Sequence, residues 1–400
     1  MKEFDPTNLP PLILTSEEGS FARRTFEVRI PRIVKDTIAA NDFPPEILQA
    51  LNSLHDEITG GVITPLHQDA PDRRFWDLHS QEYIGKSWLD VPWYWAEAFF
   101  YRRVLEATGY FVPGPSYQRD PYANQKNAEL RPDAGPHALH AILQNLPVLP
   151  EDAFKALLHA SVWGNRTDLS YNVSQNDPGA LALEQEAANL VVDDTARVWE
   201  HLIARRGGQV DFICDNAGTE LLFDFALADF LLREGLASRI TLHLKPQPFF
   251  VSDGMIKDAE FSLGTLAQST VSEVARLGRH LQEEREVRHF IFAEHPFWTT
   301  CLFFFEMPPD LRVDLAPASL VISKGDANYR RLLGDCHWLP ATPFDAIVSY
   351  FPAPLAALRT LKAELIAGLR PGEAERYRIQ DPAWLTNGQR GVVQFSDPAP

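Results

Sequence analysis

The stretch DFICDNAGTELLFDFALADFLL at residues 211–232 decides the fold of this chain. Its first residues are mostly apolar and lead into Asp215 and Asn216, and a long segment with periodic apolar residues follows. This pattern predicts a buried strand that ends at an acid and an amide, with a helix beginning just behind them. Ligands bind outside the carboxyl ends of strands in open α/β sheets, so both side chains are expected to line a site.

Two interpretations of this strand end stand side by side. Carboxylate and amide oxygens suit hard divalent cations, and a helix start favours anions, so a metal and a phosphate in one crevice is the first interpretation. The second is that Asp215 or Asn216 only caps the helix. The motif taken alone supports both about equally.

Composition limits the classes of partner. Hydrophobic residues make up 45% and charged residues 23% of the 400 residues, as in a folded protein with room for two domains. The net charge is −17, with 37 Lys and Arg against 54 Asp and Glu, and no basic run is present. These features argue against nucleic acid and anionic membranes as partners, and they leave the oligomeric state open.

The sequence also predicts a compartment. The first twenty residues carry no signal-peptide pattern, and no stretch is apolar for long enough to span a bilayer. Cys214, Cys301 and Cys336 form no CxxC pair and no disulfide framework. We therefore expect a cytoplasmic protein, with the nucleus as the alternative.

The first half of the chain reads as helical. Residues 44–54 and 93–108 carry apolar residues at three- and four-residue spacing, and the pattern resumes at 137–145 and 152–162. Residues 112–136 are rich in Pro, Gly and polar side chains, which predicts a long loop. We expect a helical N-terminal lobe over residues 1–190.

From about residue 193, helical segments alternate with short β-rich runs. The candidate strands are 210–214, 239–244, 287–292, 319–322 and 346–350, with a short last strand at 391–395 that closes an edge. Most are apolar nearly throughout, as parallel strands covered on both faces are. The sequence therefore predicts an α/β fold. It is a doubly wound, mostly parallel sheet with helices on both faces, in a Rossmann-like domain over 191–400, plus the all-helical lobe.

Polar clusters follow four of the predicted strands. Two carboxylates and an amide oxygen, from Asp215, Asp253 and Asn216, form part of an octahedral shell for a divalent cation. Lys324 and Gly325 open a strand-to-helix turn that suits an anion, and Lys362 supplies a second cation. Taken singly, each cluster has a simpler explanation. Asp253 would be a solvated acid in a loop, residues 324–326 would form an ordinary turn, and residues 359–362 would form an exposed basic face of a helix. Together at the strand ends of one sheet they predict a metal and phosphate site.

Three blocks carry a family resemblance. CDNAGTELLFDFALADFLL, SKGDANYRRLLGD and LRTLKAE resemble the damage-control phosphatase family, first catalogued as domain of unknown function 89. The Arg-Thr-x-Lys motif at 359–362 resembles the subfamily also described as acidic residue (protein-glutamate) methyltransferase. Supporting blocks lie at 87–102, at 158–169 around WGNRTDL, and at 336–343, and the similarity runs from about residue 20 to residue 396.

The resemblance implies a metal-dependent sugar-phosphate phosphatase with its site between the helical lobe and the α/β domain. Substrates would be fructose 1-phosphate, fructose 6-phosphate and related sugar phosphates, and Mn²⁺, Ni²⁺ or Co²⁺ would be preferred over Mg²⁺. The positions that match metal ligands are Asp215, Asn216 and Asp253, and those that match substrate-binding residues are Glu97, Arg102, Lys324, Gly325, Asp326, Asn328, Arg359 and Lys362. Ala327 departs from the larger apolar residue expected there, next to the site.

Two other functions remain as alternatives. One is an S-adenosylmethionine-dependent protein-glutamate O-methyltransferase, although the turn after the first strand, residues 215–218, is poor in the glycine that such a cofactor needs. The other is a non-catalytic sugar-phosphate-binding protein, although such a protein would have no evident use for the predicted metal ligands.

For catalysis, Asp215 and Asp253 are the candidate residues. We favour Asp253 as a ligand that also positions or activates an attacking water, because its long loop can aim it inward while Asp215 stands fixed at a strand end. No acid follows either residue at the spacing of the DxD motifs that form aspartyl phosphates, since Ala217 and Met255 occupy those positions.

Overall fold

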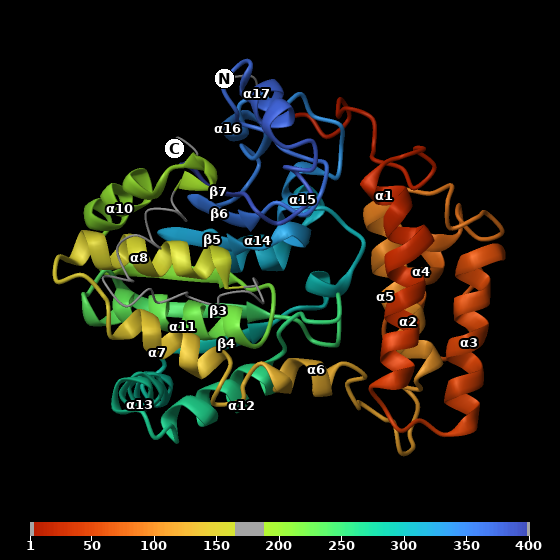
Figure 1. The fold of residues 1–400 in the computed structure, drawn as a ribbon, viewed down its shortest axis with the longest axis horizontal. Helices are drawn as coiled ribbons and strands as arrows, with labels where there is room; N and C mark the ends of the chain where they lie inside the picture. Colours follow the sequence, from red (N-terminus) through yellow and green to blue (C-terminus); the bar gives the residue numbers. More distant parts are fainter. Residues whose placement is uncertain (1–3, 165–187, 398–400) are drawn as a thin grey trace.

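The chain folds into a helical N-terminal lobe beside a sheet wrapped in helices (Figure 1). The computed structural model describes residues 4–164 and 188–397. The lobe contains α1 (Phe21–Arg24), the π-helix η1 (Thr25–Arg29), α2 (Ile30–Ala39), α3 (Pro45–Gly60), α4 (Arg73–Ser80) and α5 (Trp93–Ala107). Helices α3 and α5 confirm the helices predicted near 44–54 and 93–108, because their apolar faces pack together in the lobe core.

The sheet has seven strands in the order β1-β7-β6-β5-β2-β3-β4. The strands are β1 (Leu190–Asp193), β2 (Gly208–Ile213), β3 (Ala237–Leu244), β4 (Phe290–Glu294), β5 (Leu320–Lys324), β6 (Leu355–Thr360) and β7 (Gly391–Ser396). Strands β2 to β6 are parallel, β7 is antiparallel to β6, and β1 is parallel to β7. The prediction of a mostly parallel sheet is confirmed.

Helices cover both faces of the sheet. Leu320 and Ile322 of β5 pack in one core with α7, α8 and α11, while Val321 between them packs in a second core with α14, α15 and the N-terminal lobe. The remaining helices are α6 (Ala123–Ala128), α7 (Gly135–Leu143), α8 (Pro150–Trp163), α10 (Thr195–Ala204), α11 (Thr219–Arg233), α12 (Ile256–Ala267), α13 (Ser272–Glu286), α14 (Pro309–Leu315), α15 (Asp326–Leu333), α16 (Phe344–Ile347) and α17 (Glu373–Gln380), with 3₁₀ turns η2 (Pro296–Thr299) and η3 (Phe304–Glu306). The doubly wound α/β fold follows from this arrangement.

The strand order creates the place for a site. From β2 the chain adds β3 and β4 on one side, and it then crosses to add β5 and β6 on the other. The carboxyl ends of β2 and β5 therefore flank the point where the winding reverses. Crevices at such points are the usual ligand sites of open α/β sheets.

Several sequence-based strand assignments need correction. Residues 346–350 form no strand, because Phe344, Ile347 and Val348 are spaced like one helical face and belong to α16 and its end. The strand of this region is β6, at Leu355–Thr360. The last strand, β7, is not an edge, since β1 pairs outside it and escaped prediction. Strand β4 begins three residues later than predicted, at Phe290.

The boundary predicted at residue 190 differs from the packing. Helices α7 and α8 precede that residue, yet they lie against α11, and α8 also contacts β6 (Figure 1). Amphipathic spacing identifies a helix without showing which core it joins, so the sequence assigned both helices to the lobe.

The loop predicted at 112–136 is interrupted by α6. Among the described residues, no helix has the length and apolarity needed to cross a membrane.

Candidate active site

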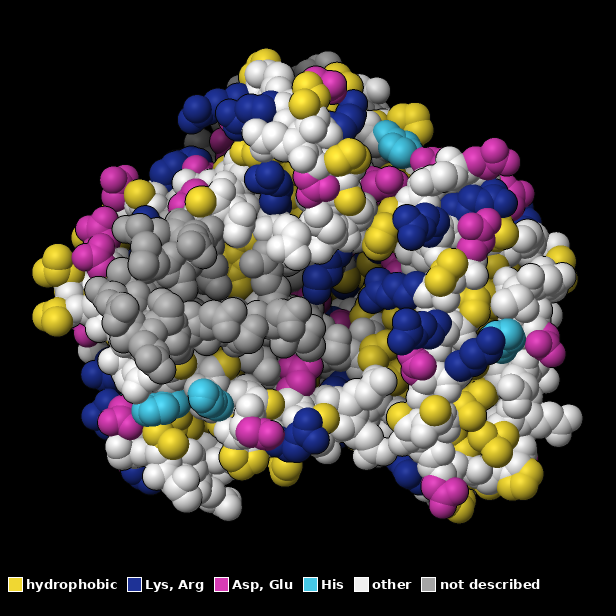
Figure 2. Space-filling view, viewed as in Figure 1, with side chains coloured by type: hydrophobic (Ala, Val, Ile, Leu, Met, Phe, Trp, Pro, Cys, Tyr) yellow, Lys and Arg dark blue, Asp and Glu magenta, His cyan; other side chains and the backbone are white. Residues whose placement is uncertain are grey.

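A cavity lies at the carboxyl ends of the central strands and opens to solvent. Figure 2 shows the hollow between the two lobes, with Lys and Arg side chains on both sides of it. Both lobes contribute to the cavity walls. Of the site residues predicted from sequence, the structure brings seven together along these walls, namely Glu97, Asp215, Asn216, Asp253, Gly325, Asp326 and Lys362.

Asp215 and Asn216 follow the end of β2 and do not cap the next helix. The residue before α11 is Gly218, whose φ of 72° is in the left-handed region that favours glycine. The first free amide of α11, that of Thr219, donates to Glu129 Oε2 at 2.9 Å. The capping interpretation of Asp215 and Asn216 therefore does not hold, and both side chains are left to line the cavity.

The Asn216 amide is held in one orientation. Its Nδ2 donates to Asp215 Oδ2 at 2.9 Å and to Glu220 Oε2 at 2.8 Å, and its Oδ1 accepts from the Ser252 hydroxyl. Sequence reasoning missed Glu220. The sequence did contain a feature that could have identified Glu220. It lies in the first turn of α11, four residues after Asn216, where a side chain still reaches the strand end.

Asp253 comes from the loop after β3, and this loop is strained. Phe250 and Val251 have φ values of 44° and 65°, a region that residues with side chains rarely adopt. Tyr101 of the N-terminal lobe packs on Phe250 with ring centroids 4.9 Å apart. The Gly254 amide donates to Asp215 O at 2.8 Å and so ties the loop to the end of β2. The lobe and the strand end together fix where Asp253 lies.

Buried charge dominates this part of the cavity. Burial raises the pKa of Asp215 well above its ordinary value, and the nearby carboxylates of Asp253 and Glu220 raise it further. Burial also raises the pKa of Asp253, while Lys245 opposes this rise with its Nζ 3.1 Å from Asp253 Oδ2. Lys245 was missed by the sequence analysis, although a lysine directly after a buried strand such as β3 is an available signal.

The donor set suits a divalent cation. Asp215 and Asp253 are buried carboxylates that disfavour each other's charge, and a cation between them would relieve that repulsion. Apart from the ion pair with Lys245, the buried Asp253 Oδ2 has no polar partner among the described residues. The described residues hold no group of three or more His, Cys, Asp or Glu side chains arranged for a metal ion. The shell therefore needs the Asn216 oxygen, water or a substrate oxygen to be completed.

Lys324 lies behind the cavity. It is the last residue of β5, 1% exposed, and its Nζ lies 2.9 Å from Glu220 Oε1, 2.9 Å from Asp224 Oδ1 and 2.8 Å from Ser161 O. Burial opposes its charge, but Asp224 and Glu220 together hold its pKa above the ordinary value. The expectation that Lys324 contacts phosphate directly is corrected, because its ammonium is already bound on the inner side of Glu220.

The turn after Lys324 still faces the cavity. Gly325 has a φ of 85°, and a side chain at this position would overlap the Asp215 carboxylate. Asn328 does not line the cavity. Its Nδ2 donates to Lys324 O at 2.8 Å and to Cys214 O at 3.3 Å, which joins the ends of β5 and β2.

Arg359 is a buried strand residue of β6 and no part of an exposed helix face. Its Nε donates to Asp326 Oδ1 at 2.7 Å, and its other nitrogens donate to the carbonyls of Ala363 and Leu365. Asp326 Oδ1 also accepts from the Lys362 amide at 3.2 Å. Arg359 therefore shapes the turn that presents Lys362 and does not contact the cavity itself.

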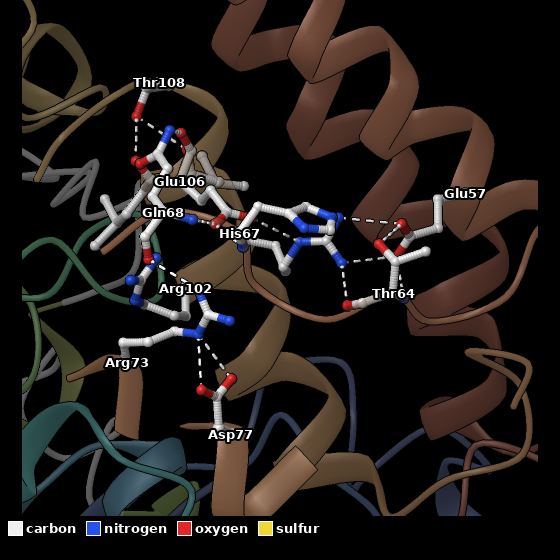
Figure 3. A network of polar contacts seen from close by, with 12 residues as sticks. Glu57, Thr64, His67, Gln68, Arg73, Asp77, Arg102, Glu106 and Thr108 are labelled. Carbon is white, nitrogen blue, oxygen red and sulfur yellow. Dashed lines mark hydrogen bonds and ion pairs between the residues drawn. The ribbon is translucent and has the colours of Figure 1, made fainter. Parts of the chain in front are cut away.

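Arg102 lies away from the cavity, inside the polar network of the lobe (Figure 3). Its Nε donates to Asp72 Oδ2 at 2.7 Å, and its guanidinium lies over the Phe111 ring at 4.5 Å. Glu97 and Arg102 are five residues apart on α5, so they point about 140° apart around the helix. The expectation that both residues face the site is corrected for Arg102.

Glu97 reaches the cavity as part of an ion cluster between the lobes. Its Oε2 accepts from Arg330 Nη1 at 2.5 Å, and Arg330 also bonds both oxygens of Asp335 at 2.7 and 2.8 Å. Burial raises the pKa of Glu97, and Arg330 opposes that rise. Asp335 Oδ2 accepts from the Tyr94 amide at 2.9 Å, so α5 and α15 are locked together. Sequence reasoning missed Arg330, because nothing in the sequence pairs residues so far apart.

Comparison with known proteins gives one consistent result. The family model described as "Damage-control phosphatase ARMT1-like domain" matches residues 25–377. The zebrafish (Danio rerio) protein named "Damage-control phosphatase ARMT1" is 34% identical, over 98% of this chain and 98% of its own length. The proteins of the same name from Homo sapiens and Mus musculus are each 31% identical, over 98% and 97% of this chain and 99% of their own lengths.

A solved structure overlaps with the chain as well. A DUF89 family protein from Pyrococcus horikoshii aligns with a TM-score of 0.49 and 14% identity, over 86% of this chain and 95% of that chain. One of the sequence blocks that carried the resemblance, at residues 158–169, lies partly outside the described residues, which stop at residue 164.

We predict that Lys324→Met destabilises the fold. The substitution leaves Glu220 and Asp224 buried without their cation, which costs about 3–5 kcal/mol of the free energy of unfolding. Urea denaturation measures the loss, with Lys155→Met on the exposed side of α8 as the control, expected within about 0.5 kcal/mol of the parent. A Lys324→Met protein with unchanged stability and lost activity would return Lys324 to the role of a direct phosphate ligand.

Proposed function

The chain belongs to the damage-control phosphatase ARMT1-like family, and from that membership we propose that this phosphatase hydrolyses sugar phosphates, fructose 1-phosphate and fructose 6-phosphate among them. One observation carries the proposal. The carboxylates of Asp215 and Asp253 and the ammonium-bearing side chain of Lys362 line the same cavity, at the ends of neighbouring strands. Oxygen ligands for a cation opposite a cationic group are what a transferring phosphoryl group needs.

Family membership implies a divalent metal cofactor. We assign Asp215, Asn216 and Asp253 as the residues that hold it, with Mn²⁺, Ni²⁺ or Co²⁺ preferred over Mg²⁺. Such a cation, when bound, supplies positive charge that offsets the negative charge of the transferring phosphoryl group. The Asn216 oxygen accepts from the hydroxyl of Ser252, which also lines the cavity, so a ligand role for this oxygen requires that hydrogen bond to be shared or replaced.

The side chains at the cavity have separate roles in the proposed reaction. Lys362 makes no side-chain hydrogen bond or ion pair within residues 4–164 and 188–397 and interacts with Asp215 only at longer range, so its ammonium can bind phosphate oxygens. Asp253, aimed inward by its strained loop, positions the water that attacks phosphorus. Asp215 stays fixed by the Asn216 amide at 2.9 Å and by the neighbouring Gly325 turn.

The two alternative functions, methyl transfer and non-catalytic binding, require different features of the cavity. A methyl donor needs backbone that approaches the cofactor closely after the first strand, whereas residues 215–218 place an acid and an amide there. A binding protein needs no pair of buried, mutually repelling carboxylates. Both features favour hydrolysis. We also propose a cytoplasmic location, with the nucleus as the alternative.

Turnover assays test this function directly. Purified protein is incubated with a panel of phosphate monoesters and Mn²⁺, Ni²⁺, Co²⁺ or Mg²⁺ in turn, and released phosphate is measured. In parallel, labelled S-adenosylmethionine and a glutamate-containing protein report methyl transfer. Phosphate release that requires the cation supports the phosphatase, and methyl transfer without phosphate release contradicts it. Binding of sugar phosphates without either reaction would identify a non-catalytic protein.

We predict that Asp253→Asn abolishes cation-dependent hydrolysis while the protein remains folded. The substitution keeps the shape of the side chain and removes a charge that a divalent cation needs. Phosphate release and the stabilisation by added Mn²⁺ in thermal unfolding are the two measurements. Asp314→Asn, an exposed acid on α14, is the control. Full activity with an unchanged Mn²⁺ response in Asp253→Asn would remove Asp253 from the cation site.

We predict that Lys362→Gln lowers kcat/KM for sugar phosphates by tens-fold. A charge-assisted contact to phosphate contributes about 1.5–3 kcal/mol, and glutamine keeps the length without the charge. Steady-state kinetics on fructose 1-phosphate measures the loss, with the exposed Lys35→Gln as the control. An unchanged kcat/KM in Lys362→Gln would place the phosphate elsewhere in the cavity.

Direct attack by water leads to a prediction about oxygen labelling. In a single turnover in ¹⁸O water, the label is expected in the released phosphate and not in the protein, because Ala217 and Met255 leave no second acid of a DxD motif. Mass spectrometry of phosphate and of the peptide with Asp253 makes the distinction. Label in that carboxylate would establish a phosphoaspartate intermediate instead.

A further inference from the structure

Arg29 lines the cavity from the N-terminal lobe and has no assigned role. It is the last residue of η1, a single π-helical turn between α1 and α2. Single π-helical turns inside α-helices are frequent at functional sites. Phe26 of the same turn is buried in the lobe core, where it stacks on Trp88 with ring centroids 5.8 Å apart. The turn therefore has a buried anchor and a cationic side chain at the cavity.

The charges of the cavity single out Arg29 and Lys362. Among the described residues that line it, each acid other than Asp215 already has a cation of its own. The pairs are Glu97 with Arg330, Asp253 with Lys245, Glu220 with Lys324 and Asp326 with Arg359. Within residues 4–164 and 188–397, the side chains of Arg29 and Lys362 make no hydrogen bond and no ion pair, and they act on the cavity acids only at longer range, Arg29 on Glu97 and Lys362 on Asp215. These two cations are therefore available to a ligand.

The two free cations come from opposite walls. Lys362 follows β6 of the α/β domain, and Arg29 belongs to the lobe, beside Glu97 and Trp93. Lys and Arg side chains on both sides of the hollow are visible in Figure 2. A guanidinium presents a planar fork that matches a carboxylate or a phosphate, while an ammonium acts as a point charge. If Lys362 binds the phosphate of the scissile ester, the guanidinium of Arg29 on the other wall remains available for another part of the substrate.

We propose that Arg29 binds a second oxyanion of the substrate, a carboxylate or a second phosphate at the end remote from the scissile ester. This inference rests on the proposed phosphatase function and extends its substrates from sugar monophosphates to phosphorylated sugar acids or sugar bisphosphates. Arg29 is then a specificity-determining residue. The lobe recognises the far end of the substrate, and the α/β domain acts on the ester.

The test compares substrates with and without the second oxyanion. Steady-state kcat/KM is measured for fructose 1-phosphate, fructose 1,6-bisphosphate and 6-phosphogluconate with the parent protein, Arg29→Gln and Arg29→Lys. We expect Arg29→Gln to lose about ten- to a hundredfold on a substrate with the second oxyanion, at least ten times more than it loses on fructose 1-phosphate. Arg29→Lys keeps the charge without the fork and should lose less. Preference for fructose 1,6-bisphosphate or for 6-phosphogluconate shows whether phosphate or carboxylate is the partner.

Arg32→Gln is the matched control, because Arg32 lies one turn away on α2, is exposed and pairs only at the surface with Asp36 at 3.4 Å. It should equal the parent on every substrate. Equal losses in Arg29→Gln on all three substrates, or no loss on any, overturn the inference. If the parent protein releases phosphate from none of the esters with any cation, the proposed function itself fails, and that outcome is separate from the result for Arg29.

Discussion

The buried ammonium of Lys324 is the contact on which the site depends. It forms ion pairs with both Glu220 and Asp224 at the inner end of the crevice, and Glu220 in turn accepts from the Asn216 amide, which also donates to Asp215. A chain of hydrogen bonds therefore runs from the protein interior to the cavity wall. Its cost is the desolvation of three charges, which only mutual pairing in good geometry offsets. Without Lys324, Glu220 and Asp224 would both be buried with no cation beside them.

The second constraint is the contact between the lobes. Arg330 bonds Glu97 and Asp335 and lies over the Trp93 ring at 3.5 Å, so one guanidinium links α5 and α15. Aromatic packing of Tyr101 on Phe250 adds a second link at the loop that carries Asp253. The cavity exists only in the assembled pair of lobes, because residues from both sides define its walls.

Much of this arrangement was predictable, and the rest was not, for physical reasons. An apolar run that stops at Asp215 and Asn216 marks a strand end at a crevice, and glycine at position 325 marks a tight turn. The sequence does not say which way a strand-end side chain points, so Lys324 was expected at the substrate and lies behind it. Partners far apart in sequence, such as Glu97 and Arg330, leave no local pattern. Short apolar runs are ambiguous between strand and helix, which explains the error at α16.

The placement of η1 and α5 on one wall and the strand ends on the other has an evolutionary consequence. Substitutions in the helical lobe alter one wall of the cavity while the acids at the strand ends stay where the sheet holds them. Substrate range can therefore diverge among descendants without rebuilding the hydrolytic machinery, because function resides in the site and not in the fold. Insertions or deletions near the single π-helical turn are the simplest route, since one residue more or less rotates the side chains that reach the cavity.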